Sequence, residues 1–243
     1  MSRALPIPLA WLVLQVLLIG LGLISIGWNL VALVLYPLLP AARGRRLGRA
    51  AIARGYAIFW WFAERSGLLQ MDAAALDRLA DEPGLIVVAN HPSLLDALML
   101  VARLPRSACV MKASLMRNPL LGPGARLARY IRNDSAHGMV RLAVADLKAG
   151  GQLVMFPEGT RTVRPPLNPL RPGVTLIAKL AQVPIQAVVI ETDSPYLGKG
   201  WPLWRLPPLP ICFRVRLGRR FAPLADSAAL LAEIEAWFAA EVR

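Results

Sequence analysis

The chain has 243 residues, of which 56% are hydrophobic, and its formal net charge at pH 7 is +13. This length fits one domain together with a membrane segment. Its two cysteines, Cys109 and Cys212, form no C-x-x-C pair or Cys/His cluster, so neither a zinc site nor a disulfide framework is indicated. A strongly basic chain can also bind nucleic acid, but no known nucleic-acid motif is visible, and we expect no such partner.

A long apolar stretch opens the chain. From Ala4 through Ala42 there is no Asp, Glu, Lys or Arg. One untilted membrane span needs only about 20 residues, and the core of a signal peptide is shorter, about 7–15 residues. We therefore predict a retained membrane element with a helix over residues 9–38, ended by Pro37 and Pro40. The stretch could be one long tilted helix or a re-entrant hairpin, because its apolar sequence is interrupted near the middle by Gly20, Gly22, Gly27 and Asn29.

A second helical pattern over residues 43–66 carries arginines early and aromatic side chains late. The arginines are expected to stay on the cytoplasmic side and to attract anionic lipid headgroups, at about 1 kcal/mol each: Arg43, Arg45, Arg46, Arg49 and Arg54. The aromatic residues fit either the water–lipid interface or a helix packed on the domain: Tyr56, Phe59, Trp60, Trp61 and Phe62. We predict a membrane-anchoring segment over residues 1–69 and a domain over residues 70–243, on the cytoplasmic side of the inner membrane.

Beyond Leu69, short apolar runs alternate with helical patterns. We expect strands at 85–88, 108–111, 153–156, 185–190 and 211–217, and helices at 93–103, 120–129, 137–148, 174–181 and 227–242. Such alternation indicates a sheet that is covered by helices on both faces. The predicted fold class is α/β, with a mostly parallel sheet flanked by helices and an N-terminal membrane-associated helical segment.

The segment 90–96, N-H-P-S-L-L-D, follows the first expected strand. Ligands of α/β sheets bind at the carboxyl ends of strands, and a neutral imidazole at His91 could take a proton from a hydroxyl. Asp96 could fix the tautomer of that imidazole and stabilise its protonated form. No serine or cysteine nucleophile stands here, so the activated hydroxyl would belong to the substrate. Alternatively, Ser93 and Asp96 form a capping box that serves only the helix backbone.

The segment 156–161, F-P-E-G-T-R, follows a second expected strand. It predicts a tight turn in which Gly159 lets the backbone approach a ligand closely. Arg161 presents a fork of donors suited to a phosphate. The alternative is an ordinary turn with a local ion pair between Glu158 and Arg161.

Taken together, these residues resemble the glycerophospholipid acyltransferase superfamily, which contains the bacterial 1-acyl-sn-glycerol-3-phosphate acyltransferases. The segment 90–96 resembles the first motif of that family and 156–161 the third. The second motif is matched by Y-I-R-N-D at 130–134 and the fourth by V-P-I at 183–185, where Gln186-Ala187 replaces a second proline often present. Met111–Leu115 and Asn118–Gly122 also fit the family pattern.

The resemblance implies that His91 is a general base oriented by Asp96. It implies acyl transfer from acyl-CoA or acyl carrier protein to the free hydroxyl of a lysophospholipid, with membrane lipids as partners and no metal or bound cofactor. Residues expected to bind the acceptor are Glu158, Gly159, Thr160 and Arg161, with Lys112 and Arg132 as additional phosphate contacts. Backbone N–H groups at the start of the helix after His91 are candidate oxyanion donors by position.

The default acceptor is 1-acyl-sn-glycerol 3-phosphate, which would give phosphatidic acid. The segment 194–201 and Arg171 differ from housekeeping members of the family, and proteins encoded beside aryl-polyene pigment pathways resemble this region. A lyso-ornithine lipid or an aryl-polyene or other specialised lipid is therefore the alternative acceptor. A non-catalytic membrane adaptor of the same fold is a third hypothesis, although such an adaptor predicts a broken His/Asp pair.

Overall fold

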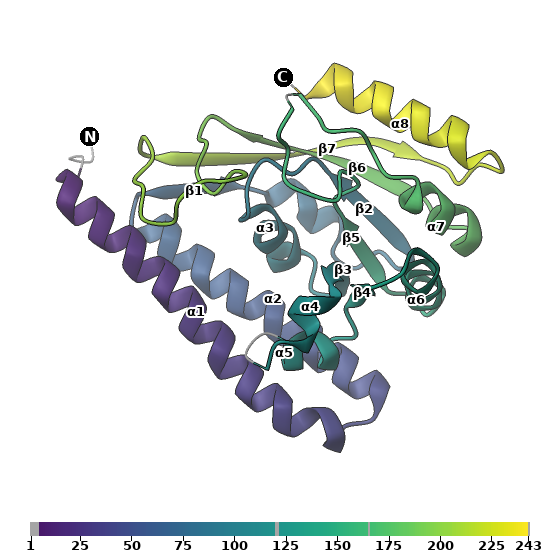
Figure 1. Cartoon of the computed structure of the whole chain (residues 1–243), viewed down its shortest axis with the longest axis horizontal. Coiled ribbons are helices and arrows are strands. Elements are labelled where there is room, and N and C mark those ends of the chain that lie inside the picture. The colour runs from purple at the N-terminus through teal and green to yellow at the C-terminus, as the bar shows by residue number, and fades with distance from the viewer. Residues whose placement is uncertain (1–4, 120–121, 165, 243) are drawn as a thin grey trace.

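The computed structural model describes residues 5–119, 122–164 and 166–242 (Figure 1). The helices are α1 (Ile7–Leu38), α2 (Ala41–Arg65), η1 (a 3-10 helix, Ala74–Leu79), α3 (Asp96–Arg103), α4 (Ala113–Arg117), α5 (Gly122–Leu127), α6 (Ala136–Lys148), α7 (Gly173–Ala181) and α8 (Ser227–Glu241). The strands are β1 (Leu69–Asp72), β2 (Leu85–Ala89), β3 (Ser107–Lys112), β4 (Ile131–Asn133), β5 (Gln152–Met155), β6 (Ile185–Thr192) and β7 (Ile211–Phe221).

Across the described residues, the strands form one sheet in the order β1-β7-β6-β2-β5-β3-β4. All neighbouring pairs are parallel except β6 and β7, which are antiparallel. Parallel strands in the middle of a sheet are covered on both faces and are therefore apolar throughout. The central strand β2 fits this rule, since all five of its residues are buried. The predicted fold class, α/β with a mostly parallel sheet, is confirmed.

Helices cover both faces of the sheet (Figure 1). Because successive side chains of a strand point to opposite faces, Val87 packs into one core cluster and its neighbours Ile86 and Val88 into another. The first cluster also contains residues of α1, α2 and α3, and the second contains residues of α6, α7 and α8.

The expected strands and helices after Leu69 are all found, with ends that differ by a few residues. Leu120 and Leu121, within one expected helix, lie outside the described residues. Four elements were not expected: β1, η1, α4 and β4. Each is between three and six residues long, too short to show a hydrophobic period in the sequence.

The apolar front of the chain is one continuous helix, α1, not a re-entrant hairpin within residues 7–38. Pro37 lies inside its last turn rather than ending it. At 1.5 Å per residue its 32 residues extend about 48 Å. Among the described residues, α1 is the helix that is long and apolar enough to cross a membrane. Its buried Asn29 accepts a hydrogen bond from the Gly124 N–H of α5 (2.8 Å), which joins α1 to the α/β domain.

The arginines of α2 have two different environments, and the prediction that all five face lipid headgroups is wrong for Arg49. This side chain is only 3% exposed. It donates to the carbonyl oxygens of Ala128 (3.0 Å) and Arg106 (2.8 Å) and to the Asp146 carboxylate (2.8 Å). Arg45 also pairs with Asp146 (3.2 Å). Arg49 therefore holds α2 against the loops and α6 at the far edge of the sheet.

The aromatic residues of α2 divide between the two environments considered from the sequence. Phe59 and Trp60 are buried in the core, and the Trp60 ring meets Phe213 of β7 edge-on at 6.0 Å. Trp61 and Phe62 are about half exposed, on the outer side of the helix. Thus α2 is at once a core helix of the domain and part of the exposed apolar surface.

Replacing Arg49 with methionine should lower the free energy of unfolding by about 3–5 kcal/mol, because it leaves the largely buried Asp146 carboxylate with Arg45 as its remaining ionic partner. Thermal and denaturant unfolding in one detergent would measure this. The matched control is Arg43→Met, since Arg43 is exposed in the same helix. Equal stabilities for the two variants would contradict a structural role for Arg49.

Candidate active site

The loops that follow β2 and β5 leave the sheet in opposite directions. These two strands are parallel neighbours, with Val88 beside Met155 at their carboxyl ends. The chain continues from β2 to α3 on the face covered by α1 and α2, and from β5 to α7 on the other face. Such a divergence opens a crevice at the edge of an α/β sheet, where ligands commonly bind. Both sequence motifs lie in these loops.

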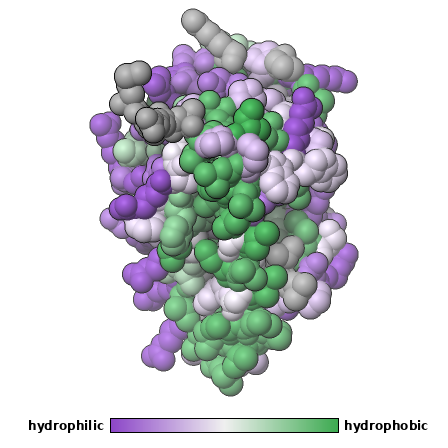
Figure 2. Space-filling model, turned by 90° about the vertical axis from the view of Figure 1, so that its left-hand side faces the viewer, coloured by the Kyte–Doolittle hydropathy of each residue, from purple (hydrophilic) through white to green (hydrophobic). Residues whose placement is uncertain are grey.

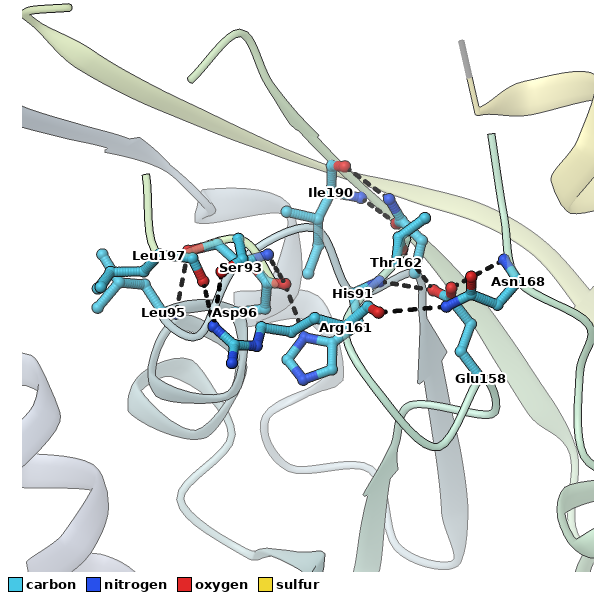
Figure 3. Close-up of polar contacts among 12 residues, drawn as sticks. His91, Ser93, Leu95, Asp96, Glu158, Arg161, Thr162, Asn168, Ile190 and Leu197 are labelled. Carbon is cyan, nitrogen blue, oxygen red and sulfur yellow. Dashed lines mark hydrogen bonds and ion pairs between the residues drawn. The ribbon is translucent and has the colours of Figure 1, made fainter. Parts of the chain in front are cut away.

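His91 and Asp96 are in direct contact, as Figure 3 shows. Nδ1 of His91 lies 2.9 Å from Oδ2 of Asp96, whose carboxylate is fully buried. An ionised Asp96 accepts the proton on Nδ1, which leaves the lone pair on Nε2. The His91 ring also stacks on Phe156 at a centroid distance of 4.0 Å. The imidazole is therefore held in one orientation, with a basic nitrogen remaining for a substrate.

Burial raises the pKa of Asp96 from 3.8 to about 6, with its hydrogen bond to His91 acting in the opposite direction. Its second oxygen, Oδ1, is buried and has no partner among the described residues. The carboxylate is thus desolvated, and the hydrogen bond from His91 is the main interaction that stabilises its charged form.

The raised pKa of Asp96 predicts an acid limit to activity. Below about pH 6 the carboxylate becomes protonated and no longer holds the imidazole in its basic tautomer. We expect kcat to fall about tenfold for each pH unit below that value. A pH profile of kcat at saturating substrates, with unfolding monitored in parallel, would test this. An activity that stays constant from pH 7 to pH 5 would contradict it.

The helix after His91 begins later than expected, at Asp96 rather than Ser93. The N–H of Leu94 donates to the Leu197 carbonyl (3.0 Å), which ties this non-helical segment to the loop after β6. The capping-box alternative is correct in part, because Asp96 Oδ2 also accepts the Ser93 N–H (2.7 Å). Asp96 therefore serves both the backbone and the imidazole.

The candidate oxyanion donors at the start of that helix are occupied within the chain. Besides Ser93 and Leu94, the N–H of Leu95 donates to the Ser93 hydroxyl (3.2 Å) and that of Asp96 to the Ser93 carbonyl (3.3 Å). Pro92 has no N–H to offer. These four N–H groups, from Ser93 to Asp96, therefore already donate within the chain and are not free to bind an oxyanion in this structure.

Glu158 joins the two motif loops. Its Oε1 accepts the His91 N–H (3.0 Å) and the Thr162 hydroxyl (2.8 Å), and Oε2 accepts the Asn168 N–H (2.9 Å). The alternative considered from the sequence, a local ion pair between Glu158 and Arg161, is not found among the described residues. Since the buried Glu158 carboxylate is occupied by protein donors, it positions the loops around His91.

The turn after β5 has the expected form. The Gly159 N–H donates to the Phe156 carbonyl (3.0 Å), and Gly159 has φ of +72°. A Cβ at this position would collide with the guanidinium of Arg171. The positive φ favours glycine here, and any larger residue would also have to displace the exposed Arg171 side chain.

Arg161 binds the loop after β6. Its Nη1 donates to the carbonyl oxygens of Leu197 (2.7 Å) and Gly198 (2.9 Å) (Figure 3). These bonds fix the guanidinium, while no bond is found for its Nε and Nη2 within the described structure. Thr160, beside it, accepts a hydrogen bond from Lys199 (3.1 Å). Arg161 is thus held in place with donors remaining for an anion.

Lys112, the last residue of β3, and Arg132, the middle residue of β4, lie on neighbouring strands and are both exposed. Arg132 pairs with Asp134 (3.1 Å) and lines a separate hollow between α2, α5 and α6. In the described part of the chain, neither contacts His91 or Arg161. Their assignment as phosphate contacts remains a prediction.

A family model described as Acyltransferase matches residues 71–191, the region that contains both loops. The chain belongs to the glycerophospholipid acyltransferase family. A 1-acyl-sn-glycerol-3-phosphate acyltransferase from Cocos nucifera is 26% identical over 68% of this chain and 54% of its own length. One from Limnanthes alba is 30% identical over 52% of this chain and 47% of its own. A lysophosphatidylcholine acyltransferase 1 from Rattus norvegicus is 31% identical over 54% of this chain and 24% of its own.

The chain spans about half the length of the curated acyltransferases that it matches first. It also shares its fold with a crystal structure described as the 1-acyl-sn-glycerophosphate (LPA) acyltransferase PlsC from Thermotoga maritima. The TM-score is 0.71 over 96% of this chain and 93% of the other, at 20% sequence identity.

Several residues that build this acyltransferase-family site were not identified from the sequence. Asn90 exchanges two hydrogen bonds with the backbone of Ile190 (2.9 and 2.7 Å), which fixes the end of β2 against β6. Phe156 supports the His91 ring, and Asn168 completes the partners of Glu158. Their positions inside or near the motifs were the available signal. No group of three or more His, Cys, Asp or Glu side chains suited to a metal occurs among the described residues.

Proposed function

We propose that this protein is an O-acyltransferase that moves a fatty acyl group from a thioester to the free hydroxyl of a lysophospholipid. The observation that carries the proposal is the contact between His91 and the buried Asp96 carboxylate, joined through Glu158 to the turn that presents Arg161. This arrangement combines a general base with an anion-binding side chain in one crevice. The intact pair does not favour a non-catalytic adaptor.

The chemistry follows from the free Nε2 of His91. Nε2 takes the proton of the acceptor hydroxyl as the hydroxyl oxygen attacks the thioester carbonyl. The new C–O bond gives a tetrahedral oxyanion, and Asp96 stabilises the imidazolium that forms. When the C–S bond breaks, the leaving thiolate takes the proton from the imidazolium. The products are the diacyl lipid and a free thiol, and His91 is again neutral.

The acceptor is proposed to be 1-acyl-sn-glycerol 3-phosphate, with Arg161 on its phosphate. The free donors of Arg161 support a phosphate group, and most of the named relatives carry this acceptor in their names. A relative named for lysophosphatidylcholine keeps other lysophospholipids open as acceptors. The donor is proposed to be acyl-CoA or acyl carrier protein, with no metal or bound cofactor taking part.

The membrane is proposed to be reached through α1. Large apolar side chains are exposed along this helix, and the domain packs along its other side near both ends. A helix that is held against the domain near both ends can offer only its outer face to lipid. We propose attachment to the inner membrane with the domain on its cytoplasmic side, since exposed arginines such as Arg43 and Arg46 follow α1. Residues 1–69 would form the anchor and residues 70–243 the transferase domain.

Acyl transfer from labelled acyl-CoA and from labelled acyl carrier protein to a set of acceptors tests the function. The set contains 1-acyl-sn-glycerol 3-phosphate, lysophosphatidylcholine and lyso-ornithine lipid, which lacks a phosphate. We expect the highest kcat/KM for the first, and Arg161→Gln should raise KM for it more than for the phosphate-free acceptor. A preference for lyso-ornithine lipid would replace the proposed acceptor. A folded protein inactive with every pair of substrates would leave the adaptor as the better hypothesis.

A further inference from the structure

The loop between β6 and β7 contains a β-turn with an apolar tip. The N–H of Arg205 donates to the Pro202 carbonyl (3.1 Å), so Leu203 and Trp204 occupy the two central positions. Their side chains are 53% and 72% exposed. Central turn positions usually carry Gly, Asn, Asp or Pro. Two large apolar side chains there indicate that the tip meets something other than water.

The tip is held rigidly in its projecting position. On either side of it, Trp201 and Leu206 pack against the same core cluster as Ala10 and Leu14 of α1. The Trp201 indole donates to the Arg205 carbonyl (3.2 Å), and the Arg205 guanidinium lies 4.7 Å above the Trp201 ring. The exposure of the tip is therefore a feature of the folded loop.

The turn lies directly against α1. The Trp11 indole donates to the Trp204 carbonyl (2.7 Å), and the Gln15 amide donates to the Leu203 carbonyl (3.3 Å). Figure 1 shows this loop beside the N-terminal half of α1, and Figure 2 shows the band of hydrophobic residues that runs along this side of the molecule. Exposed members of α1 in this half include Leu12, Val16 and Ile19. The apolar tip extends that band onto a second element.

We propose that the Leu203–Trp204 turn is a membrane-inserting element that enters the same leaflet as α1. A lipid surface is the partner because the turn is continuous with a helix whose exposed face suits lipid, and because tryptophan favours the interface between lipid and water. Arg205, adjacent to the tip and exposed, is at the position to meet anionic headgroups. The inference rests on the membrane attachment in the proposed function and not on acyl transfer.

The same loop also contacts the candidate active site. A few residues before the turn, Leu197 and Gly198 accept the hydrogen bonds of Arg161, and Lys199 donates to Thr160. A tip fixed in the headgroup layer would therefore set the depth at which Arg161 faces a lipid phosphate. This connection gives the turn a role in reaching membrane-resident acceptors, separate from the chemical step.

The full chain in vesicles of mixed phosphatidylethanolamine and phosphatidylglycerol provides the test. An environment-sensitive NBD dye is attached at Trp204→Cys, in a Cys109→Ala and Cys212→Ala background whose unfolding temperature is checked. Val16→Cys on α1 is the lipid-exposed control, and Leu224→Cys, exposed in the loop between β7 and α8, is the aqueous control. We expect the dyes at 204 and 16 to be quenched by doxyl-labelled lipid and shielded from aqueous iodide, and the dye at 224 to behave oppositely.

Iodide quenching at 204 as strong as that at 224 would overturn the proposal. So would shielding at 204 that appears only at high protein concentration and accompanies cross-linking to a second copy, because the partner would then be protein. These readouts need no turnover, so they remain valid if the proposed acyl transfer is not found.

Activity gives a second measurement. The double variant Leu203→Ala, Trp204→Ala should raise KM for acceptor in vesicles about tenfold, on the order expected from losing part of two apolar contacts. Its kcat with the same acceptor in detergent micelles should be unchanged, and Trp204→Phe should retain most of the vesicle activity. An equal loss of activity in vesicles and micelles would indicate a structural role for the turn and contradict the proposal.

Discussion

Replacing His91 with glutamine should lower kcat by roughly 10²–10⁴-fold while leaving the fold intact. The glutamine amide can still donate to the buried Asp96 carboxylate, but it has no basic nitrogen to take the hydroxyl proton. Acyl transfer to 1-acyl-sn-glycerol 3-phosphate, measured at saturating substrates beside a thermal unfolding curve, gives both quantities.

The alanine variant of His91 separates the chemical role from the structural one. It removes the side-chain partner of Asp96 Oδ2 as well as the base and leaves only the Ser93 N–H on this buried oxygen, so it should lose stability in addition to activity. Loss of turnover in both variants, with stability lost only in His91→Ala, is the expected pattern. Turnover close to the wild-type rate in His91→Gln would show that another group acts as the base.

Asp96→Asn should abolish most of the activity, by about 10²–10⁴-fold in kcat, yet should not destabilise the protein at pH 8. The Ser93 N–H and Nδ1 of His91 both contact the same oxygen, Oδ2. An asparagine oxygen in that place accepts both hydrogen bonds, so the imidazole keeps its orientation, but the negative charge that stabilises the imidazolium is lost. The variant would keep the geometry and lose this stabilisation.

The stability of Asp96→Asn follows from the raised pKa of Asp96. An acid whose pKa is 3.8 when unfolded and about 6 when folded binds more protons in the folded chain between these values. Its contribution to the free energy of unfolding is therefore greatest at low pH and falls as pH rises from about 4 to about 6, by an amount on the order of 3 kcal/mol. At pH 8 the neutral asparagine avoids that cost, so the unfolding temperature should equal or exceed that of the wild type.

Unfolding temperatures of both proteins between pH 4 and pH 8 would test this difference. The wild type should gain stability relative to Asp96→Asn as the pH is lowered. A variant that is less stable than the wild type at pH 8 would show that hydrogen bonding of the ionised carboxylate outweighs its desolvation.

The sequence predicts the α/β fold because its core elements are strongly patterned. Leu85–Val88 is apolar throughout, as a central parallel strand must be, and the helix over 137–148 is long enough to show a period. The three residues of β4 carry no such signal, because this strand exists through its pairing with β3. Sequence patterns are weakest where a short element depends on its neighbours.

The sequence predicts those residues of the candidate site that belong to its two motifs. His91, Asp96 and Arg161 come from two short segments, and the fold brings those segments together. The roles of Asn168 and of the carbonyl groups at Leu197 and Gly198 depend on loops that are distant in sequence, so no spacing indicates them. Arg49 was misjudged for a related reason. Arg49 lies in an arginine-rich segment that follows an apolar helix, and such a segment usually faces lipid headgroups. Only its contact with the buried Asp146 carboxylate shows that its role is structural.

The hydrogen bond between Asn29 of α1 and Gly124 of α5 bears on whether the α/β domain could fold without α1. Separating α1 from the domain would leave the Asn29 oxygen without its partner, and would remove Ala10 and Leu14 from the core cluster that also contains Trp60 and Leu68. A chain shortened to begin after α1 would therefore not become an ordinary water-soluble transferase domain. It would expose part of its own interior, so helix and domain are expected to fold, and to melt, as a single cooperative unit.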